Sequence, residues 1–368
     1  MIDYAQWGFK MNVLSLFDGM SCGQIALDQL DFNVDNYYAA EIDKWAMQVA
    51  KKNYPNTKHL GDVTELKGSD LPKIDLLMGG SPCQGFSFAG KQLNFDDPRS
   101  ALFFEFVRLL KETKPKYFLL ENVRMKQEFQ DVISDHLGVK PIMINSALMS
   151  AQNRVRLYWT NIPGVNQPTD RGIVLKDILE SDTEKKFDLS DKAVAYMKRH
   201  RNGKSRFEYH KNPLDGKASC IVAVQYKGVP YGVLEKPCDP KVLIIKEATK
   251  KGYTEIQDGD CFDATFPTSK TRRGRNMKDK SNCLTAANYE YMRYEHPTYR
   301  KLTPLECERL QTVPDNYTEG VSNTQRYKML GNGWTVDVIA HILQNMNYVL
   351  KAEYRGHDYY EDTIKEDY

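Results

Sequence analysis

The sequence has no hydrophobic run near the roughly 18 residues that a membrane-spanning helix needs, and residues 1–10 lack the apolar core of a signal peptide. Its seven cysteines are widely spaced, and none forms a CxxC pair or lies at zinc-ligand spacing from a histidine. These absences argue against a membrane protein, a disulfide framework and a structural metal site. They predict a cytoplasmic protein with reduced thiols and no bound metal.

Net charge is also small, at +2 over 368 residues, so any footprint for nucleic acid has to be local. Two basic clusters meet that requirement, one at residues 198–206 and one at 270–280. The second contains Arg272, Arg273 and Arg275 in a polar, glycine-containing stretch that is typical of a loop. Runs of charge are usually solvated faces, but two clusters in one region of a near-neutral chain suggest contacts with phosphate groups.

The dinucleotide fingerprint G-x-G-x-x-G is missing, although the chain opens with a strand, a glycine turn and a helix. Residues 12–17 form an apolar strand, and the turn Asp18-Gly19-Met20-Ser21-Cys22-Gly23 follows. The same rhythm continues with predicted strands at 37–41, 74–78 and 117–120 and predicted helices at 44–52 and 100–111. This alternation predicts an α/β fold with a Rossmann-like sheet. The turn by itself is as consistent with a structural βα connection as with a ligand site.

Carboxylates follow several of the predicted strands. Glu41 comes about 20 residues after the glycine turn, where doubly wound folds place the acid that binds ribose hydroxyls. Asp62 lies in a third loop, where a role as helix N-cap or turn residue is the simpler explanation. Glu121 ends an apolar strand, and burying an unpaired charge is costly, so it is either a paired structural carboxylate or a functional acid. Parallel strands bring these ends to one edge of the sheet.

One stretch, Gly79-Gly80-Ser81-Pro82-Cys83-Gln84-Gly85-Phe86-Ser87, directly follows a buried strand. The glycines break the strand, and Pro82 restricts the backbone just before Cys83. The pattern predicts a cysteine on a stiff turn at the carboxyl end of a strand, where open α/β sheets bind ligands. A thiolate there is a strong nucleophile, although a lone cysteine is more often a small buried residue.

Residues 142–148 and 155–160 alternate as strands of a predicted antiparallel edge. Arg154 and Arg156, two positions apart, are expected on the same face of a strand. Two guanidinium groups on one face suit a bound anion or a polarised carbonyl, and a solvated charged face is the alternative.

The βα rhythm stops near Asn161-Ile162-Pro163-Gly164. We therefore predict four parts of the chain. These are an extension at 1–10, a catalytic domain at 11–164 completed by 327–352, a second, smaller domain at 165–326, and a loose tail at 353–368. Within the last third, Thr303, Pro304 and Glu306 predict a capped helix through Gln311. Residues 331–336 predict the start of a final amphipathic helix.

As a set, these features resemble the DNA cytosine-5 methyltransferases, which depend on S-adenosylmethionine. The matching stretches occur in that family's order and spacing over nearly the whole chain: Phe17-Asp18-Gly19, Glu41, Gly61-Asp62-Val63, Ser81-Pro82-Cys83-Gln84, Glu121-Asn122-Val123, Gln152-x-Arg154-x-Arg156, Arg300–Gln311 and Gly331–Val336. The last stretch contains Trp334, where bacterial members usually carry a Gly-Asn-Ser-Val type ending. Residues 102–106 and 156–159 also resemble the catalytic domain of the eukaryotic de novo methyltransferases, here as a free-standing prokaryotic or phage-type chain.

The resemblance implies a smaller target recognition domain beside the methyltransferase sheet, and it implies roles for single residues. The implied catalytic residues are Cys83 as nucleophile on cytosine C6, Glu121 as acid at N3, and Arg154 and Arg156 at the ring carbonyl or a phosphate. Phe17 and Trp334 would flank the adenine of S-adenosylmethionine, Glu41 would bind the ribose, and Asp62 the adenine amino group. The other implied cofactor residues are Asp18, Gly19, Met20, Ser21, Ile42, Val63, Pro82, Asn332 and Gly333. The implied contacts with double-stranded DNA are Gln84, Ser87, Asn122, Arg272, Arg273 and Arg275.

The reaction implies base flipping, because the target atom is inaccessible within a duplex. A cognate restriction endonuclease is an expected functional partner, without a stable complex. Two other functions stay open: a tRNA cytosine-5 methyltransferase on the same fold, and a catalytically silent DNA-binding relative. Residues 84–87 and the long second region favour DNA over tRNA, and an intact Cys83 and Glu121 argue against a silent relative. An NAD-dependent oxidoreductase is disfavoured because its fingerprint is missing.

Overall fold

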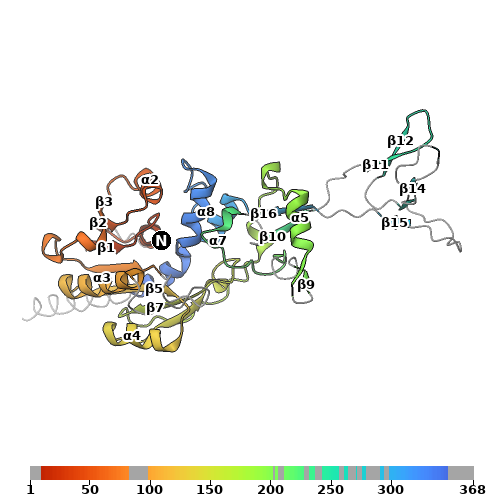
Figure 1. Ribbon diagram of the computed structural model, residues 1–368. Helices are drawn as coiled ribbons and strands as arrows, with labels where there is room; N and C mark the ends of the chain where they lie inside the picture. Colours follow the sequence, from red (N-terminus) through yellow and green to blue (C-terminus); the bar gives the residue numbers. More distant parts are fainter. Residues whose placement is uncertain are drawn as a thin grey trace, which may run out of the picture. The chain divides into compact units, whose positions relative to one another are not determined.

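The computed structural model describes residues 10–82, 98–201, 204–205, 211–227, 232–236, 243–256, 261–263, 271, 276–278, 291–293 and 298–346 (Figure 1). The chain divides into two compact units. The first comprises Met1–Asp182, Asn212–Gly232 and Thr303–Tyr368, and the second comprises Thr183–Lys211 and Val233–Leu302. The predicted site residues Cys83, Gln84, Ser87, Arg272, Arg273 and Arg275 lie outside the described residues, as does the predicted tail.

A seven-stranded sheet, in the order β3-β2-β1-β4-β5-β7-β6, forms the centre of the first unit. Its strands are β1 (Met11–Leu16), β2 (Val34–Ala40), β3 (Lys58–Gly61), β4 (Leu76–Gly80), β5 (Tyr117–Val123), β6 (Ile142–Asn145) and β7 (Val155–Thr160). Strands β1 to β5 run parallel to one another, whereas β7 runs antiparallel to its two neighbours, β5 and β6. The predicted Rossmann-like sheet is confirmed. Residues 146–148 of the predicted edge strand form a short 3₁₀ helix instead.

The central strands are buried on both faces, as expected for parallel strands covered by helices. On one face, Phe103 and Phe106 of α3 (Pro98–Thr113) and Ile133 of α4 (Gln127–Leu137) belong to the core cluster that includes Leu77 and Trp159 of the sheet. Figure 1 shows α3 and α4 on the same side of the sheet. Each fully buried aromatic or aliphatic side chain contributes roughly 1.5–3 kcal/mol, so this face anchors the strands that carry the site.

The first unit contains further helices. They are α1 (Cys22–Gln29), α2 (Lys44–Asn53), α7 (Pro304–Leu310), α8 (Asn323–Asn332), residues 336–346, and the 3₁₀ helices η2 (Val63–Glu65), η3 (Gly68–Asp70), η4 (Ser146–Leu148), η5 (Leu175–Ile178) and η7 (Gln225–Lys227). The capping box of Thr303 and Glu306 before α7 is confirmed. Gly331 and Asn332 end α8 instead of opening the last helix, which begins at residue 336.

The second unit consists of short antiparallel strands with one helix, α5 (Asp191–Lys198), and one 3₁₀ helix, η6 (Lys185–Phe187), among its described residues. Its strand pairs are β8 (His200–Arg201) with β9 (Lys204–Ser205), β10 (Val233–Lys236) with β16 (Thr298–Lys301), β11 (Leu243–Lys246) with β12 (Tyr253–Ile256), and β13 (Cys261–Asp263) with β14 (Asn276–Lys278) and β15 (Tyr291–Arg293). This compact unit is smaller than the predicted range 165–326, whose functional boundaries stay a prediction. Residues 212–232 belong to the first unit.

Candidate active site

A cavity of about 590 Å³ opens at the carboxyl ends of the parallel strands of the first unit. The turns that follow β1, β2, β4 and β5 all contribute to its lining. The predicted site residues that line it are Phe17, Asp18, Gly19, Glu41, Ile42, Asp62, Val63, Pro82, Glu121, Asn122, Arg154, Arg156, Asn332, Gly333 and Trp334. Met20 and Ser21 are almost fully buried and are not part of the lining. The strand ends therefore meet at one cavity, as the parallel topology predicts.

Glu41, directly after β2, is fixed by three main-chain N–H groups. Gly19 donates to one carboxylate oxygen at 2.8 Å, and Ile42 and Asp43 donate to the other at 2.8 and 2.7 Å. The carboxylate also ties the first glycine turn to the end of the second strand. Its remaining lone pairs can accept hydrogen bonds from the two hydroxyls of a ribose, which is the role predicted for it.

The turn after β1 is shaped by two residues with left-handed backbone, Phe17 at φ 57° and Ser21 at φ 66°. Both oxygens of Asp18 accept hydrogen bonds, one from the Tyr37 hydroxyl at 2.7 Å and one from the Ser21 hydroxyl. Burial raises the pKa of Asp18 to about 6, against the opposing effect of hydrogen bonds from Ser15, Ser21 and Tyr37. This turn therefore presents a carboxyl group with a pKa of about 6.

Asp62 caps the short helix η2 and accepts hydrogen bonds from both the N–H and the hydroxyl of Thr64, each at 2.9 Å. Those bonds lower the pKa of Asp62 below its ordinary value. The N-cap role weighed from the sequence is thus present, and Asp62 lines the cavity as well. Ile42 also lines it while being 71% exposed, so its apolar side chain is available to cover a flat ligand ring.

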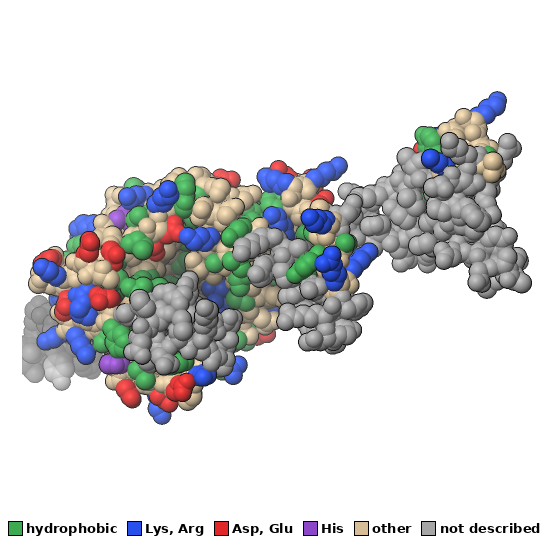
Figure 2. All heavy atoms as spheres, viewed as in Figure 1, with side chains coloured by type: hydrophobic (Ala, Val, Ile, Leu, Met, Phe, Trp, Pro, Cys, Tyr) green, Lys and Arg blue, Asp and Glu red, His purple; other side chains and the backbone are tan. Residues whose placement is uncertain are grey.

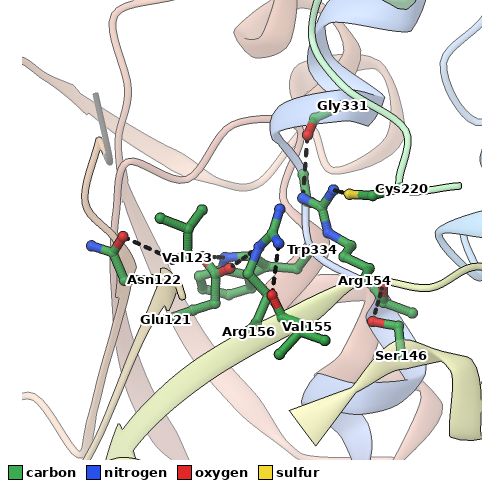
Figure 3. A network of polar contacts seen from close by, with 12 residues as sticks. Glu121, Asn122, Val123, Ser146, Arg154, Val155, Arg156, Cys220, Gly331 and Trp334 are labelled. Atoms are coloured by element: carbon green, nitrogen blue, oxygen red, sulfur yellow. Dashed lines mark hydrogen bonds and ion pairs between the residues drawn. The ribbon is translucent and has the colours of Figure 1, made fainter. Parts of the chain in front are cut away.

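Glu121 lies in the sheet register opposite Gly80 and is 8% exposed. Figure 3 shows the two donors that hold its carboxylate. Arg156 Nε lies 2.9 Å from Oε1, and the indole Nε1 of Trp334 donates to Oε2 at 3.0 Å. Although burial acts to lower it, the Glu121 charge raises the pKa of Arg156 above its ordinary value. Glu121 is therefore a paired carboxylate that also lines the cavity.

Arg154 is 3% exposed, and its contacts differ from those of Arg156 (Figure 3). One terminal nitrogen donates to the Ile221 carbonyl at 3.1 Å and the Cys220 sulfur at 3.3 Å. The other donates to the carbonyls of Gly331 at 3.2 Å and Gly333 at 2.7 Å. Arg154 thus joins the start of β7 to two distant segments, and its two terminal nitrogens are engaged by the protein itself.

Two buried glutamines complete this arrangement. Gln152 donates to the Leu310 carbonyl at 2.7 Å and to the side-chain oxygen of Gln311 at 2.9 Å. Gln311 donates in turn to the carbonyls of Leu330 at 2.6 Å and Gly333 at 3.0 Å. Both glutamines lie within the sequence motifs, but no role was predicted for either of them. Their signal was weak because a glutamine's partners, unlike those of a helix cap, are not fixed by local spacing.

The segment that leads to Cys83 is tied to β5. The side-chain amide of Asn122 donates to the Ser81 hydroxyl at 3.1 Å, and Gly80 pairs with Glu121 in the sheet. Ser81 and Pro82 then lead to Cys83, which lies outside the described residues. The predicted proximity of Cys83 to Glu121 accordingly stays a prediction, supported by the position of Gly80.

The surface of the first unit offers no broad field of one charge among the described residues on the face drawn in Figure 2, where acidic and basic side chains are interspersed. This agrees with the small net charge of the whole chain. Arg272, Arg273 and Arg275 of the second basic cluster lie outside the described residues.

Comparison with known proteins decides the family. The model of the C-5 cytosine-specific DNA methylases matches residues 11–348 of this chain. The chain belongs to this family. It is a DNA cytosine-5 methyltransferase, as the motifs had suggested.

Relatives of this methyltransferase come from bacteria and phage. The type II methyltransferase M1.ScrFI of Lactococcus lactis subsp. cremoris is 31% identical over 93% of this chain and 79% of its own length. The type II methyltransferase M.NlaX of Neisseria lactamica is 29% identical over 92% of this chain and 97% of its own length. Bacillus phage SPR supplies the orphan methyltransferase M.SPRI, 27% identical over 92% of this chain and 97% of its own length.

Solved structures share the methyltransferase fold at low sequence identity. A methyltransferase of Entamoeba histolytica, EhMeth, aligns with a TM-score of 0.64 at 16% identity, covering 93% of this chain and 99% of that one. A variant of Spodoptera frugiperda DNMT2 aligns with a TM-score of 0.61 at 19% identity, covering 91% and 99%. These likenesses confirm the fold of the methyltransferase and no more than the fold.

One pair at the methyltransferase cavity was not predicted. Lys328 of α8 lies 2.6 Å from the carboxylate of Asp43 at the start of α2, and both side chains line the cavity. Partial burial acts to raise the pKa of Asp43, but the Lys328 hydrogen bond and two main-chain N–H groups lower it overall. The pair is an ionised link between the second strand turn and the last third of the chain.

Two kinds of feature are absent from the residues that the structure describes. No group of three or more His, Cys, Asp or Glu side chains there is arranged to hold a metal ion. Within the same ranges, none of the helices has both the length and the apolar character needed to cross a membrane.

Proposed function

We propose that this methyltransferase modifies C5 of a cytosine flipped out of duplex DNA, through a covalent adduct between the Cys83 sulfur and C6 of the ring. The observation that carries the proposal is the Glu121 carboxylate, held by Arg156 and Trp334 beside the point where Gly80 leads toward Cys83. An acid fixed at the carboxyl ends of these strands is the group needed to stabilise the charge that develops on the cytosine ring during attack.

The cavity fits S-adenosylmethionine, the cofactor implied by the family. Besides Glu121, the carboxylates of Asp18, Glu41, Asp43 and Asp62 line it and suit a cationic ligand with hydroxyl and amino donors. We propose that Glu41 holds the ribose, Asp62 the adenine amino group, and the turn at Asp18 the methionine part. When bound, S-adenosylmethionine supplies an electrophilic methyl group on a sulfonium centre.

The chain's own groups then account for the activation of the base. Cytosine C5 is a poor nucleophile, and addition of the Cys83 thiolate to C6 gives an enamine with a nucleophilic C5. Negative charge spreads to N3 and O2, where Glu121 in its protonated form donates to N3. Once C5 carries the methyl group, loss of its proton and departure of the Cys83 thiolate restore the aromatic ring.

Arg156 is the arginine placed to act on the base. Its Nε lies beside Glu121 and one of its terminal nitrogens donates to the Val155 carbonyl, whereas both terminal nitrogens of Arg154 are used by protein acceptors. We therefore assign the ring-carbonyl role to Arg156 and a structural role to Arg154. The sequence predicted both arginines at the site, and their different contacts support different roles.

The covalent step can be tested with duplex DNA that carries 5-fluorocytosine, since fluorine cannot leave C5 as a proton does. We expect an adduct on a denaturing gel that requires S-adenosylmethionine, and its loss in Cys83→Ser together with a fall of more than about a thousandfold in methyl transfer. Transfer to tRNA in preference to duplex DNA would instead support the alternative function. An adduct at another cysteine would overturn the assignment of Cys83.

DNA contacts are proposed for Gln84, Ser87 and Asn122 near the base and for Arg272, Arg273 and Arg275 at phosphates. Neutralising the three arginines should weaken DNA binding and reduce the slope of log K against log salt by up to about 3, since each lost phosphate contact releases about one counterion fewer. Binding titrations at several salt concentrations measure that slope. An unchanged slope would remove this loop from the DNA-binding surface.

Several relatives are named type II methyltransferases, and one phage relative is named an orphan methyltransferase. We propose that this chain modifies DNA in the same manner, protecting sites from a cognate endonuclease without forming a stable complex with it. Methylation-sensitive sequencing of DNA from expressing cells would identify the modified site.

The finer likeness to eukaryotic de novo enzymes rests on residues 102–106 and 156–159 alone.

A further inference from the structure

Trp334 is buried beside the cavity at the carboxyl ends of the strands, and its side chain packs against two glycines. A Cβ on Gly80 would lie 2.8 Å from the indole Nε1 and 3.1 Å from Glu121 Oε2, and a Cβ on Gly23 would lie 3.4 Å from the far edge of the indole ring. The carbon on Gly80 would press on the indole and on its hydrogen bond, whereas the carbon on Gly23 would be in ordinary contact with the ring. Gly80 thus leaves room for the contact between Trp334 and Glu121.

The direction of this contact is unambiguous. An indole N–H is a donor only, so Glu121 Oε2 must accept, at 3.0 Å. Arg156 occupies the other oxygen at 2.9 Å. Each carboxylate oxygen therefore has one fixed donor and keeps lone-pair capacity for a proton or for a donor on the substrate.

The backbone around Trp334 is fixed on both sides by groups of this chain. Before it, the Gly333 carbonyl accepts from Arg154 at 2.7 Å and from Gln311 at 3.0 Å. After it, the Thr335 hydroxyl donates to the Gln311 side chain at 2.9 Å, and the Val336 N–H donates to the Gln311 carbonyl at 2.9 Å. These four hydrogen bonds fix the backbone that carries the indole.

We propose that Trp334 is a positioning residue for the catalytic carboxylate, orienting Glu121 through its indole N–H. The proposal rests on the proposed function, because Glu121 must be the acid at N3. It gives Trp334 a purpose other than stacking on adenine. A donor to a carboxylate favours the ionised form, so loss of the N–H should make Glu121 easier to protonate as well as less well oriented.

Trp334→Phe tests this, because phenylalanine keeps an aromatic ring and removes the donor. In single-turnover methyl transfer to duplex DNA across pH, the maximal rate should fall about tenfold, the loss expected for one hydrogen bond to a charged group. The wild-type pH profile should have one limb that is absent in Glu121→Gln. In Trp334→Phe that limb should lie at higher pH. Affinity for S-adenosylmethionine, by calorimetry, should stay within about twofold of the wild type.

A matched control is Trp159→Phe. Trp159 is also buried, and its indole N–H donates at the same 3.0 Å distance, to the partly buried hydroxyl of Ser134 on α4. Its loss should lower stability while the pH profile stays unmoved. A second readout needs no variant of Trp334: among the four tryptophans, one indole N–H signal should titrate by NMR in the wild type and not in Glu121→Gln.

The decisive comparison is the double variant. If Trp334 acts through Glu121, adding Trp334→Phe to Glu121→Gln should cost less than about twofold in rate. Full tenfold losses in both backgrounds with an unmoved pH profile, or a cofactor affinity weakened tenfold or more, would overturn the proposal. Failure of the proposed function is a separate outcome, in which Glu121→Gln itself transfers methyl groups at the wild-type rate.

Discussion

The two sides of the cavity are held together in different ways. On the cofactor side most of these hydrogen bonds are local: Glu41 accepts from Ile42 and Asp43, its immediate successors, and from Gly19, 22 positions earlier, and Asp62 accepts from Thr64 two positions on. The ion pair of Asp43 with Lys328, 285 positions away, is a long-range contact on that side. On the catalytic side, Glu121 accepts from Trp334, 213 residues away. Arg154 on that side contacts residues 67 and 177 positions away, Ile221 and Gly331.

The difference shows how each side depends on the fold. Local hydrogen bonds form once a strand end and its turn exist, because little chain entropy is lost in closing them. The catalytic side requires segments from the middle and the end of the chain to dock on β7 before any of its bonds can form. We therefore expect distant substitutions to disturb catalysis more readily than cofactor binding.

The largest expected effect is on Arg154. Arg154→Met would leave the carbonyls of Ile221, Gly331 and Gly333 without this buried donor, and should lower the free energy of unfolding by about 3–5 kcal/mol. Urea denaturation measures the loss. The control is Arg309→Met, which removes a partly exposed pair with Asp315 and should cost about 1 kcal/mol or less. Equal losses would show that the distant segments do not depend on Arg154.

A smaller effect, confined to the cofactor side, is expected from Glu41→Gln. The new amide would place a donor against the N–H of Gly19 or those of Ile42 and Asp43, so S-adenosylmethionine affinity should fall about tenfold to a hundredfold. Calorimetry gives the affinity. Asp35→Asn, which changes an exposed acid of β2, the strand that precedes Glu41, should leave the affinity unchanged. A weakened DNA affinity without any change for the cofactor would contradict the division into two sides.

The smallest effect concerns Asp18 and pH. Its pKa near 6 means that the carboxyl is largely protonated at pH 5 and ionised at pH 7.5, so affinity for the cationic cofactor should rise several-fold between them. S-adenosylhomocysteine, which lacks the sulfonium charge, should show little of this rise, and Asp18→Asn should abolish it. Equal pH dependence for both ligands would place Asp18 away from the sulfonium.

The same raised pKa has a consequence for stability. Because the folded chain binds the Asp18 proton more tightly than the unfolded chain, this group's contribution is present in full below about pH 4 and is lost as the pH rises through 6. The pH dependence of stability between these values should therefore be weaker in Asp18→Asn.

Prediction from sequence worked where partners are close along the chain. The strand-turn-helix rhythm, the capping box of Thr303 and Glu306, and the cap role of Asp62 follow from spacing alone, and the structure contains each. For Arg154 and Arg156 the spacing indicated one shared role. The contacts differ because Arg154 meets two segments whose approach no local pattern encodes.

The sequence by itself determined that parallel strands end in carboxylates and that these ends share an edge, since strand direction and hydrophobic pattern are local properties. Only the tertiary structure decided which donor each carboxylate receives. Trp334 reaches Glu121 because α8, Gln311 and Arg154 fix the turn at Gly333, and because Gly80 has no side chain to obstruct it. Such contacts between residues hundreds of positions apart depend on packing, which becomes definite only when the whole sheet and its covering segments are assembled.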